Sequence, residues 1–177
     1  IYPGIEAVQN SYNQGKIGKS ELNFLEKIIS NSIQIINLEN VEINQKKNVI
    51  IVSADYQSSL LAEAASASFH TDGWQVFHLG DMSSAIDVLF DLDLQKFVSK
   101  IWKSKIGIMI VVVFSSTEDG LKFFAESVNS IRAKFRRNFY LALCGNTSQN
   151  TEIKADLMGE NLETTLQWCQ TTFESSK

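Results

Sequence analysis

The sequence predicts an α/β fold in which helices cover both faces of a parallel β-sheet. Short apolar, β-branched segments alternate with longer segments of helical periodicity. Most of the short segments are apolar at consecutive positions, which is typical of strands buried on both faces of a parallel sheet. Right-handed crossovers leave few topologies, and five predicted strands favour a doubly wound, flavodoxin-like sheet of order 2-1-3-4-5.

Two helices are predicted before the sheet. The first begins near Pro3, which suits a first helical turn, and its apolar face is formed by Ile5, Val8 and Tyr12. The second has Ser20 as its N-cap, and its apolar stripe is formed by Leu22, Leu25, Ile29 and Ile33. A polar linker over residues 39–47 follows. We therefore predict a helical segment with its linker over residues 1–44 and an α/β domain over residues 45–177.

Strands and helices alternate through the α/β domain, without internal repeats. The predicted strands cover residues 49–52, 74–78, 108–114, 139–143 and 153–157. The predicted helices cover residues 57–71, 83–102, 121–135 and 162–173. Gly73 ends the first of these helices, and Ser83 or Ser84 caps the second.

Composition argues against several classes of protein. The net charge of −4 gives no reason to expect nucleic-acid binding, and the longest apolar run, residues 106–114, is too short to span a bilayer. No signal segment opens the chain, and Ile1 suggests a piece of a longer protein. Cys144 and Cys169 have no metal-ligand spacing, so we predict reduced, buried thiols in a cytoplasmic protein.

Ligands of open parallel sheets bind beyond the carboxyl ends of the strands, at the switch point beside the first strand. The residues that follow the predicted strands are mostly small or carry hydroxyl groups. The loop over residues 53–58 has no glycine, which excludes a dinucleotide site and a P-loop. A phospho-receiver would need an aspartate in place of Ser115, and no nucleophile elbow or zinc-ligand spacing is present. These loops favour a binding pocket without catalytic residues.

Several motifs follow one another in a set order. The strand over residues 48–53 precedes a helix of small residues and then the segment Gly73-Trp74-Gln75-Val76-Phe77-His78-Leu79-Gly80. The later motifs are Ser115-Ser116 after the third strand, Gly145-Asn146 after the fourth, and Ala155-Asp156 near the fifth. Over residues 48–173 this order resembles the cobalamin (B12)-binding domain family, with its strand, Asp-x-His-x-x-Gly, helix and Gly-aromatic-x-Val-x-x-Leu-Gly. The preceding helices resemble the helical segment of B12-dependent regulators and methyltransferases.

The central motif departs from the family's pattern. Counting back from Gly80 without gaps places Ser58 at the histidine position. A shift of one residue places Asp55 over the family's aspartate and Gln57 over its histidine. In either register the imidazole that ligates cobalt in the family is missing, and the motif glycine is a leucine. The resemblance therefore implies a degenerate member without histidine-ligated corrinoid chemistry.

The resemblance implies a cofactor-binding edge and leaves its ligand open. The residues at this edge are Asp55, Gln57, Ser58, His78, Gly80, Ser115, Ser116, Gly145 and Asn146. The pocket holds cobalamin without a ligand from this loop, or haem as in haem-sensing relatives, or nothing. His78 is either an iron or cobalt ligand or a polar residue at a strand end, and no metal ligand is assigned. Asp55 is either a carboxylate that orients a ligand or a helix N-cap.

The function that the resemblance implies is that of a regulatory or sensory module, in signal transduction or transcription regulation. Its partners would be attached or separate signalling domains, or a second copy of the chain, and neither nucleic acid nor a membrane. The alternative is a corrinoid carrier subunit for methyl transfer or a mutase.

Two further features bear on these alternatives. The first helix of the domain carries a run of small residues, namely Ala62, Ala64, Ala65, Ser66, Ala67 and Ser68. In the family such residues leave a slot for the nucleotide tail of cobalamin, but they also suit a helix packed tightly on a sheet. Trp74 is predicted to lie in the core, where the second strand meets the helices.

Overall fold

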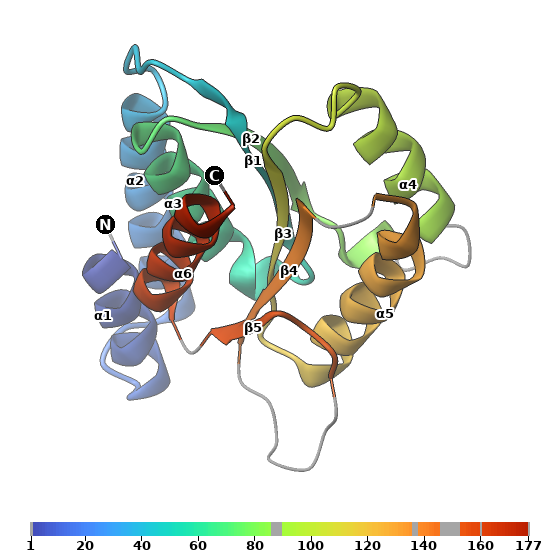
Figure 1. Ribbon diagram of the computed structural model, residues 1–177. Helices are drawn as coiled ribbons and strands as arrows, with labels where there is room; N and C mark the ends of the chain where they lie inside the picture. The colour runs from blue at the N-terminus through green and yellow to red at the C-terminus, as the bar shows by residue number, and fades with distance from the viewer. Residues whose placement is uncertain (1, 86–89, 136–137, 146–152, 160, 177) are drawn as a thin grey trace.

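The computed structural model describes residues 2–85, 90–135, 138–145, 153–159 and 161–176. Its centre is a five-stranded sheet in which neighbouring strands are parallel and follow the order β2-β1-β3-β4-β5 (Figure 1). The strands are β1 (Asn44–Ser53), β2 (Trp74–Asp81), β3 (Ile108–Phe114), β4 (Phe139–Cys144) and β5 (Leu157–Gly159). The predicted fold class and strand order are confirmed.

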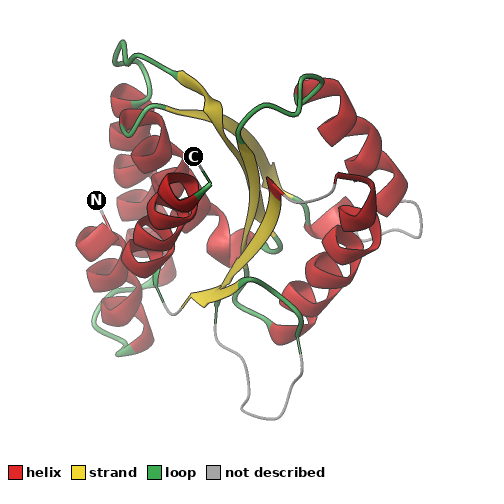
Figure 2. Ribbon diagram, in the orientation of Figure 1, coloured by secondary structure: helices red, strands yellow, loops and turns green. Residues whose placement is uncertain are grey.

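Helices lie on both faces of the sheet, as Figure 2 shows. One side contains α1 (Tyr2–Asn13), α2 (Lys19–Ile36), α3 (Ser59–Thr71) and α6 (Leu162–Ser175). The opposite side contains α4 (Phe90–Ile101) and α5 (Glu118–Phe135). Two short 3-10 helices, η1 (Tyr56–Ser58) and η2 (Ser83–Ala85), follow β1 and β2. None of the helices in the described part of the chain is both long and apolar enough to cross a membrane.

Successive side chains of the strands enter two separate hydrophobic cores. In β3, Ile110 and Val112 belong to the core shared with α3 and α6, whereas Val111 and Val113 belong to the core shared with α4 and α5. All seven residues of β3 are buried, as expected for a central strand covered on both faces.

Trp74 lies in the first of these cores, as predicted, with 1% of its surface exposed. Its ring packs edge-on against Phe69 of α3 and Phe173 of α6, with ring centroids 5.3 and 6.2 Å away. The side chain of Trp74 therefore joins β2 to two helices.

The N-terminal helices pack onto the α/β domain through a few apolar residues. Ile5 and Ile33 are each 1% exposed and belong to the same core as α3 and α6. The N-cap of α2 is Gly18 and not Ser20, because the Glu21 carboxylate accepts a hydrogen bond from the Gly18 amide (2.8 Å). The predicted apolar face of α1 is correct in part. Ile5 is buried, but Tyr12, at the other end of the predicted face, is 39% exposed.

Several predicted boundaries differ from the structure. β1 begins at Asn44, inside the predicted linker. β2 continues to Asp81, because Gly80 takes a positive φ of 73° where the pairing with β1 changes register. β5 begins at Leu157 instead of residue 153. The long helix predicted from residue 83 is a 3-10 turn and then α4, and residues 86–89 lie outside the described residues.

Candidate functional site at the strand exits

The carboxyl ends of β1 and β3 lie side by side at the centre of the sheet. Ser53 is paired with Phe114, and the amide of Ala54 donates a hydrogen bond to the Phe114 carbonyl oxygen (2.8 Å). The loops that leave the two strands, residues 54–58 and 115–117, therefore meet at the switch point, where ligands of such sheets bind.

Asp55 joins these two loops through its carboxylate. Its Oδ1 accepts hydrogen bonds from the amide and the hydroxyl of Ser58, both at 2.9 Å. Its Oδ2 accepts hydrogen bonds from the Ser115 hydroxyl (3.0 Å) and the Ser116 amide (2.7 Å). Asp55 is also the N-cap of η1, which is one of the two roles predicted for it. The structure thus brings four of the predicted site residues into one network.

Burial and hydrogen bonding act in opposite directions on the pKa of Asp55. Partial burial raises the pKa, but the hydrogen bonds from Ser116, Ser58 and Ser115 outweigh this effect and hold the pKa below its usual value of 3.8. The carboxylate is therefore charged at neutral pH. A carboxylate offers about four acceptor positions, and here four donors fill them.

The Ser115 hydroxyl also forms the turn that leads into α5. It lies 2.8 Å from the Thr117 carbonyl oxygen and accepts a hydrogen bond from the Thr117 amide (3.1 Å). A hydroxyl has one proton, so Asp55 and the Thr117 carbonyl share it as acceptors. Ser115 is 4% exposed, and its hydroxyl is committed to this network.

Two glycines allow the backbone to close around Ser115. A Cβ atom at Gly145 would overlap the Ser115 carbonyl oxygen, and a Cβ atom at Gly120 would lie 2.5 Å from the Ser115 Oγ. Gly145, a predicted cofactor-binding residue, therefore has a packing role between the exits of β3 and β4. Asn146, predicted together with it, lies outside the described residues.

The two candidate positions for a cobalt ligand differ in exposure. Ser58 is 7% exposed and faces Asp55, whereas Gln57 is exposed. Gln57 lines a hollow of about 230 Å³ between α2 and the start of α3. The other residues around this hollow are Asn23, Glu26, Lys27, Ser30, Tyr56, Ser59, Leu60 and Glu63. Pockets for cofactor-sized ligands usually measure about 300–1,000 Å³, so this hollow is small for such a ligand.

His78 does not end its strand, which corrects the prediction. It is paired with Ile51, three residues before β2 ends at Asp81, and so lies about 10 Å short of the carboxyl end. His78 is exposed, yet partial desolvation lowers its pKa, an effect that the Glu63 carboxylate opposes. The imidazole is therefore neutral at neutral pH.

The small residues of α3 pack against neighbouring elements. Five of them are at most 8% exposed, namely Ala62, Ala64, Ala65, Ser66 and Ala67. The four alanines among them belong to the hydrophobic core that α3 shares with the sheet and with α2. Ser68 is partly buried, and its hydroxyl donates a hydrogen bond to the Ala64 carbonyl oxygen (3.0 Å). These contacts favour a tightly packed helix over a slot for a nucleotide tail.

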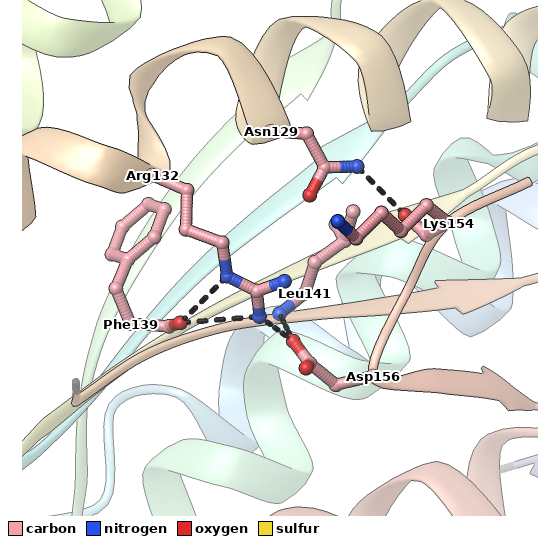
Figure 3. A network of polar contacts seen from close by, with 6 residues as sticks. All are labelled: Asn129, Arg132, Phe139, Leu141, Lys154 and Asp156. Carbon is pink, nitrogen blue, oxygen red and sulfur yellow. Dashed lines mark hydrogen bonds and ion pairs between the residues drawn. The ribbon is translucent and has the colours of Figure 1, made fainter. Parts of the chain in front are cut away.

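A second polar network lies at the β4 edge of the sheet (Figure 3). Arg132 of α5 donates hydrogen bonds from Nε and Nη2 to the Phe139 carbonyl oxygen (both 3.3 Å) and forms an ion pair with Asp156. The Asp156 carboxylate accepts a hydrogen bond from the Leu141 amide (2.8 Å). β5 pairs with β4 only from Ala142 onward, so these side chains cover the part of the β4 edge that β5 leaves open.

The sequence predicts Asp156 only as part of a family motif, and no pattern in it points to Arg132. No periodicity or motif connects the two residues, because they come together only after α5 and β4 have packed. Asn129, one turn before Arg132, donates a hydrogen bond to the Lys154 carbonyl oxygen (2.7 Å) and ties the same segment to α5. Since most partners in this network are backbone groups, we assign it a structural role.

The thiols and the charged side chains give little scope for metal binding. Within the described ranges, no group of three or more His, Cys, Asp or Glu side chains could hold a metal ion. Cys144 and Cys169 are free and buried, and burial raises the pKa of the Cys144 thiol to about 11. Burial also raises the pKa of Cys169. Both thiols are therefore protonated and unreactive at neutral pH.

Comparison with known proteins supports the fold. No family model and no curated protein matches the sequence. The solved structure of the monomethylamine corrinoid protein of Methanosarcina barkeri does match, with a TM-score of 0.61 and 14% sequence identity. The match covers 97% of this chain, and so includes its N-terminal helices, and 78% of that chain. The chain therefore has the fold of a corrinoid protein.

The described residues do not fit a corrinoid held by a histidine. Positions 57 and 58 carry glutamine and serine, neither of which replaces an imidazole as a cobalt ligand. The carboxylate of Asp55, which would orient such an imidazole, is already bound by Ser58, Ser115 and Ser116.

Proposed function

We propose that this chain is a regulatory or interaction module that has the fold of a corrinoid protein and works without histidine-ligated cobalt. The observation that supports the proposal is the Asp55 carboxylate, which accepts four hydrogen bonds from the loops after β1 and β3. In a histidine-ligated site this carboxylate would accept the imidazole N–H instead. The proposed partners are attached or separate signalling domains, and two buried free cysteines support a reducing, cytoplasmic location.

The test is a set of absorption titrations of the purified protein with hydroxocobalamin and with haemin. We expect no retention of cobalamin through gel filtration. We also expect no nitrogen splitting in the electron paramagnetic resonance spectrum of Co(II) cobinamide, a corrinoid without the nucleotide base that could itself ligate cobalt. Retention of either corrinoid, without nitrogen splitting from the cobinamide, would replace the proposal with a corrinoid site that has no protein ligand. A Soret shift with haemin that disappears in His78→Ala would replace it with a haem site, since the neutral imidazole of His78 is able to ligate iron.

A corrinoid carrier for methyl transfer or a mutase is the second candidate, favoured by the structural match over helices and sheet together. This function requires that the corrinoid pocket is still open and lacks only the side chain that ligates cobalt. Gln57→His restores an imidazole at an exposed position, and Ser58→His restores one at a buried position next to Asp55. Nitrogen splitting in either variant after Co(II) cobinamide is added would support the carrier and would identify the register of the motif. We expect the affinity of these variants for the corrinoid to be about 10–100-fold below that of a site in which a carboxylate orients the histidine. The reason is that Asp55 already accepts hydrogen bonds from Ser58, Ser115 and Ser116.

A further inference from the structure

α2 carries a second apolar face, opposite to the one that enters the core. Its large exposed residues are Phe24 (67%), Ile28 (47%), Ile35 (69%) and Leu38 (83%), the last in the turn that follows the helix. Together with the exposed Asn31 they repeat at alternating intervals of four and three residues, which places all five on one side of the helix. The buried Ile33 lies on the other side. Soluble helices normally have one apolar stripe, so a second one indicates a contact with another helix.

We propose that this face binds a second copy of the chain, with the two α2 helices antiparallel across a two-fold axis near Asn31. A two-fold contact requires a surface that is complementary to itself. The apolar residues are arranged almost symmetrically about Asn31, so that Phe24 of one copy meets Leu38 of the other and Ile28 meets Ile35. The amide of Asn31 both donates and accepts hydrogen bonds, so it can pair with its own counterpart on the axis. A polar residue at such a position sets the register of a helix pair.

The charges beside the stripe are compatible with this arrangement. Beside the central part of the stripe, one flank carries Lys27 and Gln34, and the other carries Leu25 and Ser32. In the antiparallel pair Lys27 lies opposite Gln34 of the second copy, and Ser32 lies opposite its own counterpart. Lys27, the charged residue among these four, therefore meets no like charge across the interface.

The exposed area is sufficient for a weak dimer. An aromatic side chain carries about 150–250 Å² and an aliphatic one somewhat less, so the four side chains expose roughly 450 Å² per copy at their exposed fractions. Two copies would bury about 900 Å², which lies at the low end for specific interfaces. We therefore expect a reversible dimer whose population rises with concentration. This proposal does not depend on whether the strand-exit loops hold a ligand.

Light scattering after size exclusion, over a range of protein concentrations, measures this association. We expect the apparent mass to rise from the monomer value of 19.9 kDa towards twice that value. Ile35→Lys should weaken the association at least about tenfold, because it buries a charge against Ile28 of the second copy. Leu92→Lys is the matched control, since Leu92 is 47% exposed on α4, on the opposite side of the sheet, and should leave the association unchanged. Circular dichroism confirms that each variant folds, and Phe24→Ser is a second variant of the stripe.

Cysteine cross-linking tests the geometry. Asn31→Cys places a thiol next to its counterpart on the axis, so mild oxidation should yield a disulfide-linked dimer. Ser20→Cys, also exposed on α2, would lie about 33 Å from its counterpart in an antiparallel pair and should not cross-link. Cross-linking of both variants would overturn the antiparallel arrangement. A chain that stays monomeric at all concentrations, or oligomers that Ile35→Lys does not affect, would overturn the proposal and leave a different protein or a lipid surface as the occupant of the stripe.

Discussion

Asp55 is the residue whose replacement should affect the strand exits most. Asp55→Ala removes the acceptor for four hydrogen bonds and the N-cap of η1. We expect it to lower the free energy of unfolding by about 1–3 kcal/mol, measured by urea denaturation. Asp55→Asn keeps one acceptor oxygen and a similar shape, so it should lose less. Equal stability of Asp55→Ala and the wild type would show that the network does not hold the loops together.

The contribution of Asp55 should also depend on pH. Its pKa is lower in the folded state than the usual 3.8, so the charged carboxylate stabilises the fold fully above that value. The difference in stability between the wild type and Asp55→Asn should therefore be constant above about pH 5 and should shrink as the pH falls below 3.8. A difference that grows in acid would have the wrong sign for this mechanism.

Gly145 offers a test of close packing at the same place. Gly145→Ala introduces a Cβ that overlaps the Ser115 carbonyl oxygen and lies 3.2 Å from the Leu121 side chain. We expect a loss of about 1–3 kcal/mol in the free energy of unfolding. Gly4→Ala is the control, because a Cβ at Gly4 in α1 meets no atom within 4 Å, and this variant should be neutral or slightly more stable.

At the residue scale, local sequence patterns predict contacts between near neighbours better than contacts across the sheet. Asp55 could be predicted as an N-cap because its partner, Ser58, is three residues away. Its contacts with Ser115 and Ser116, about sixty residues later, depend on the pairing of β1 with β3, and no local pattern encodes them. Gly145 fitted a cofactor motif, but its contact with Ser115 is a property of the packed strands.

At the scale of the elements, the packing of α3 shows whether its small residues leave a slot for a ligand or fill the hydrophobic core. Ala65 is fully buried, so Ala65→Leu should overpack the contact between α3 and its neighbours. We expect a loss of about 1–3 kcal/mol in thermal or urea unfolding. Thr71→Leu, at the exposed end of the same helix, should change stability little. If Ala65→Leu were as stable as the wild type, the helix would have free space beside it, as a ligand slot requires.

Trp74 tests the junction of β2 with α3 and α6. Trp74→Ala removes the contacts with Phe69 and Phe173 and leaves a large cavity, so it should cost about 3–5 kcal/mol. Trp74→Phe keeps an aromatic ring and should lose clearly less. A loss below about 1 kcal/mol in denaturant melts for Trp74→Ala would be incompatible with burial in this core.

The elements themselves were largely predictable, because consecutive apolar residues predict buried strands. Their ends were less predictable, for reasons that can be named. β2 passes His78 because Gly80 adopts a positive φ and lets the pairing shift by one residue. Asp156 lies before β5 and uses its side chain, in addition to its backbone, to bind Leu141. The pattern of hydrophobic residues cannot predict a shift in strand register. It also cannot predict that a side chain will bind the backbone amide of a neighbouring strand.

At the scale of the whole molecule, the N-terminal helices and the α/β domain should unfold together. Ile33 of α2 lies in the same core as Trp74. We expect Ile33→Ala to cost about 2–4 kcal/mol and to shift unfolding measured by circular dichroism and by tryptophan fluorescence to the same extent. All three tryptophans lie in the α/β domain, whereas circular dichroism also reports α1 and α2. Two separate transitions would show that the helical segment is an independent unit.

The Arg132–Asp156 network has a consequence for how the chain is made. β4 is synthesised before residue 156, so its outer edge offers unpaired amide and carbonyl groups to other nascent chains until Asp156 emerges. Once Asp156 binds Leu141 and Arg132, that part of the edge is closed by a pair of opposite charges. The interval between the two events is the time when the chain is most prone to aggregate through this strand, and its length depends on the rate of translation from Cys144 to Asp156.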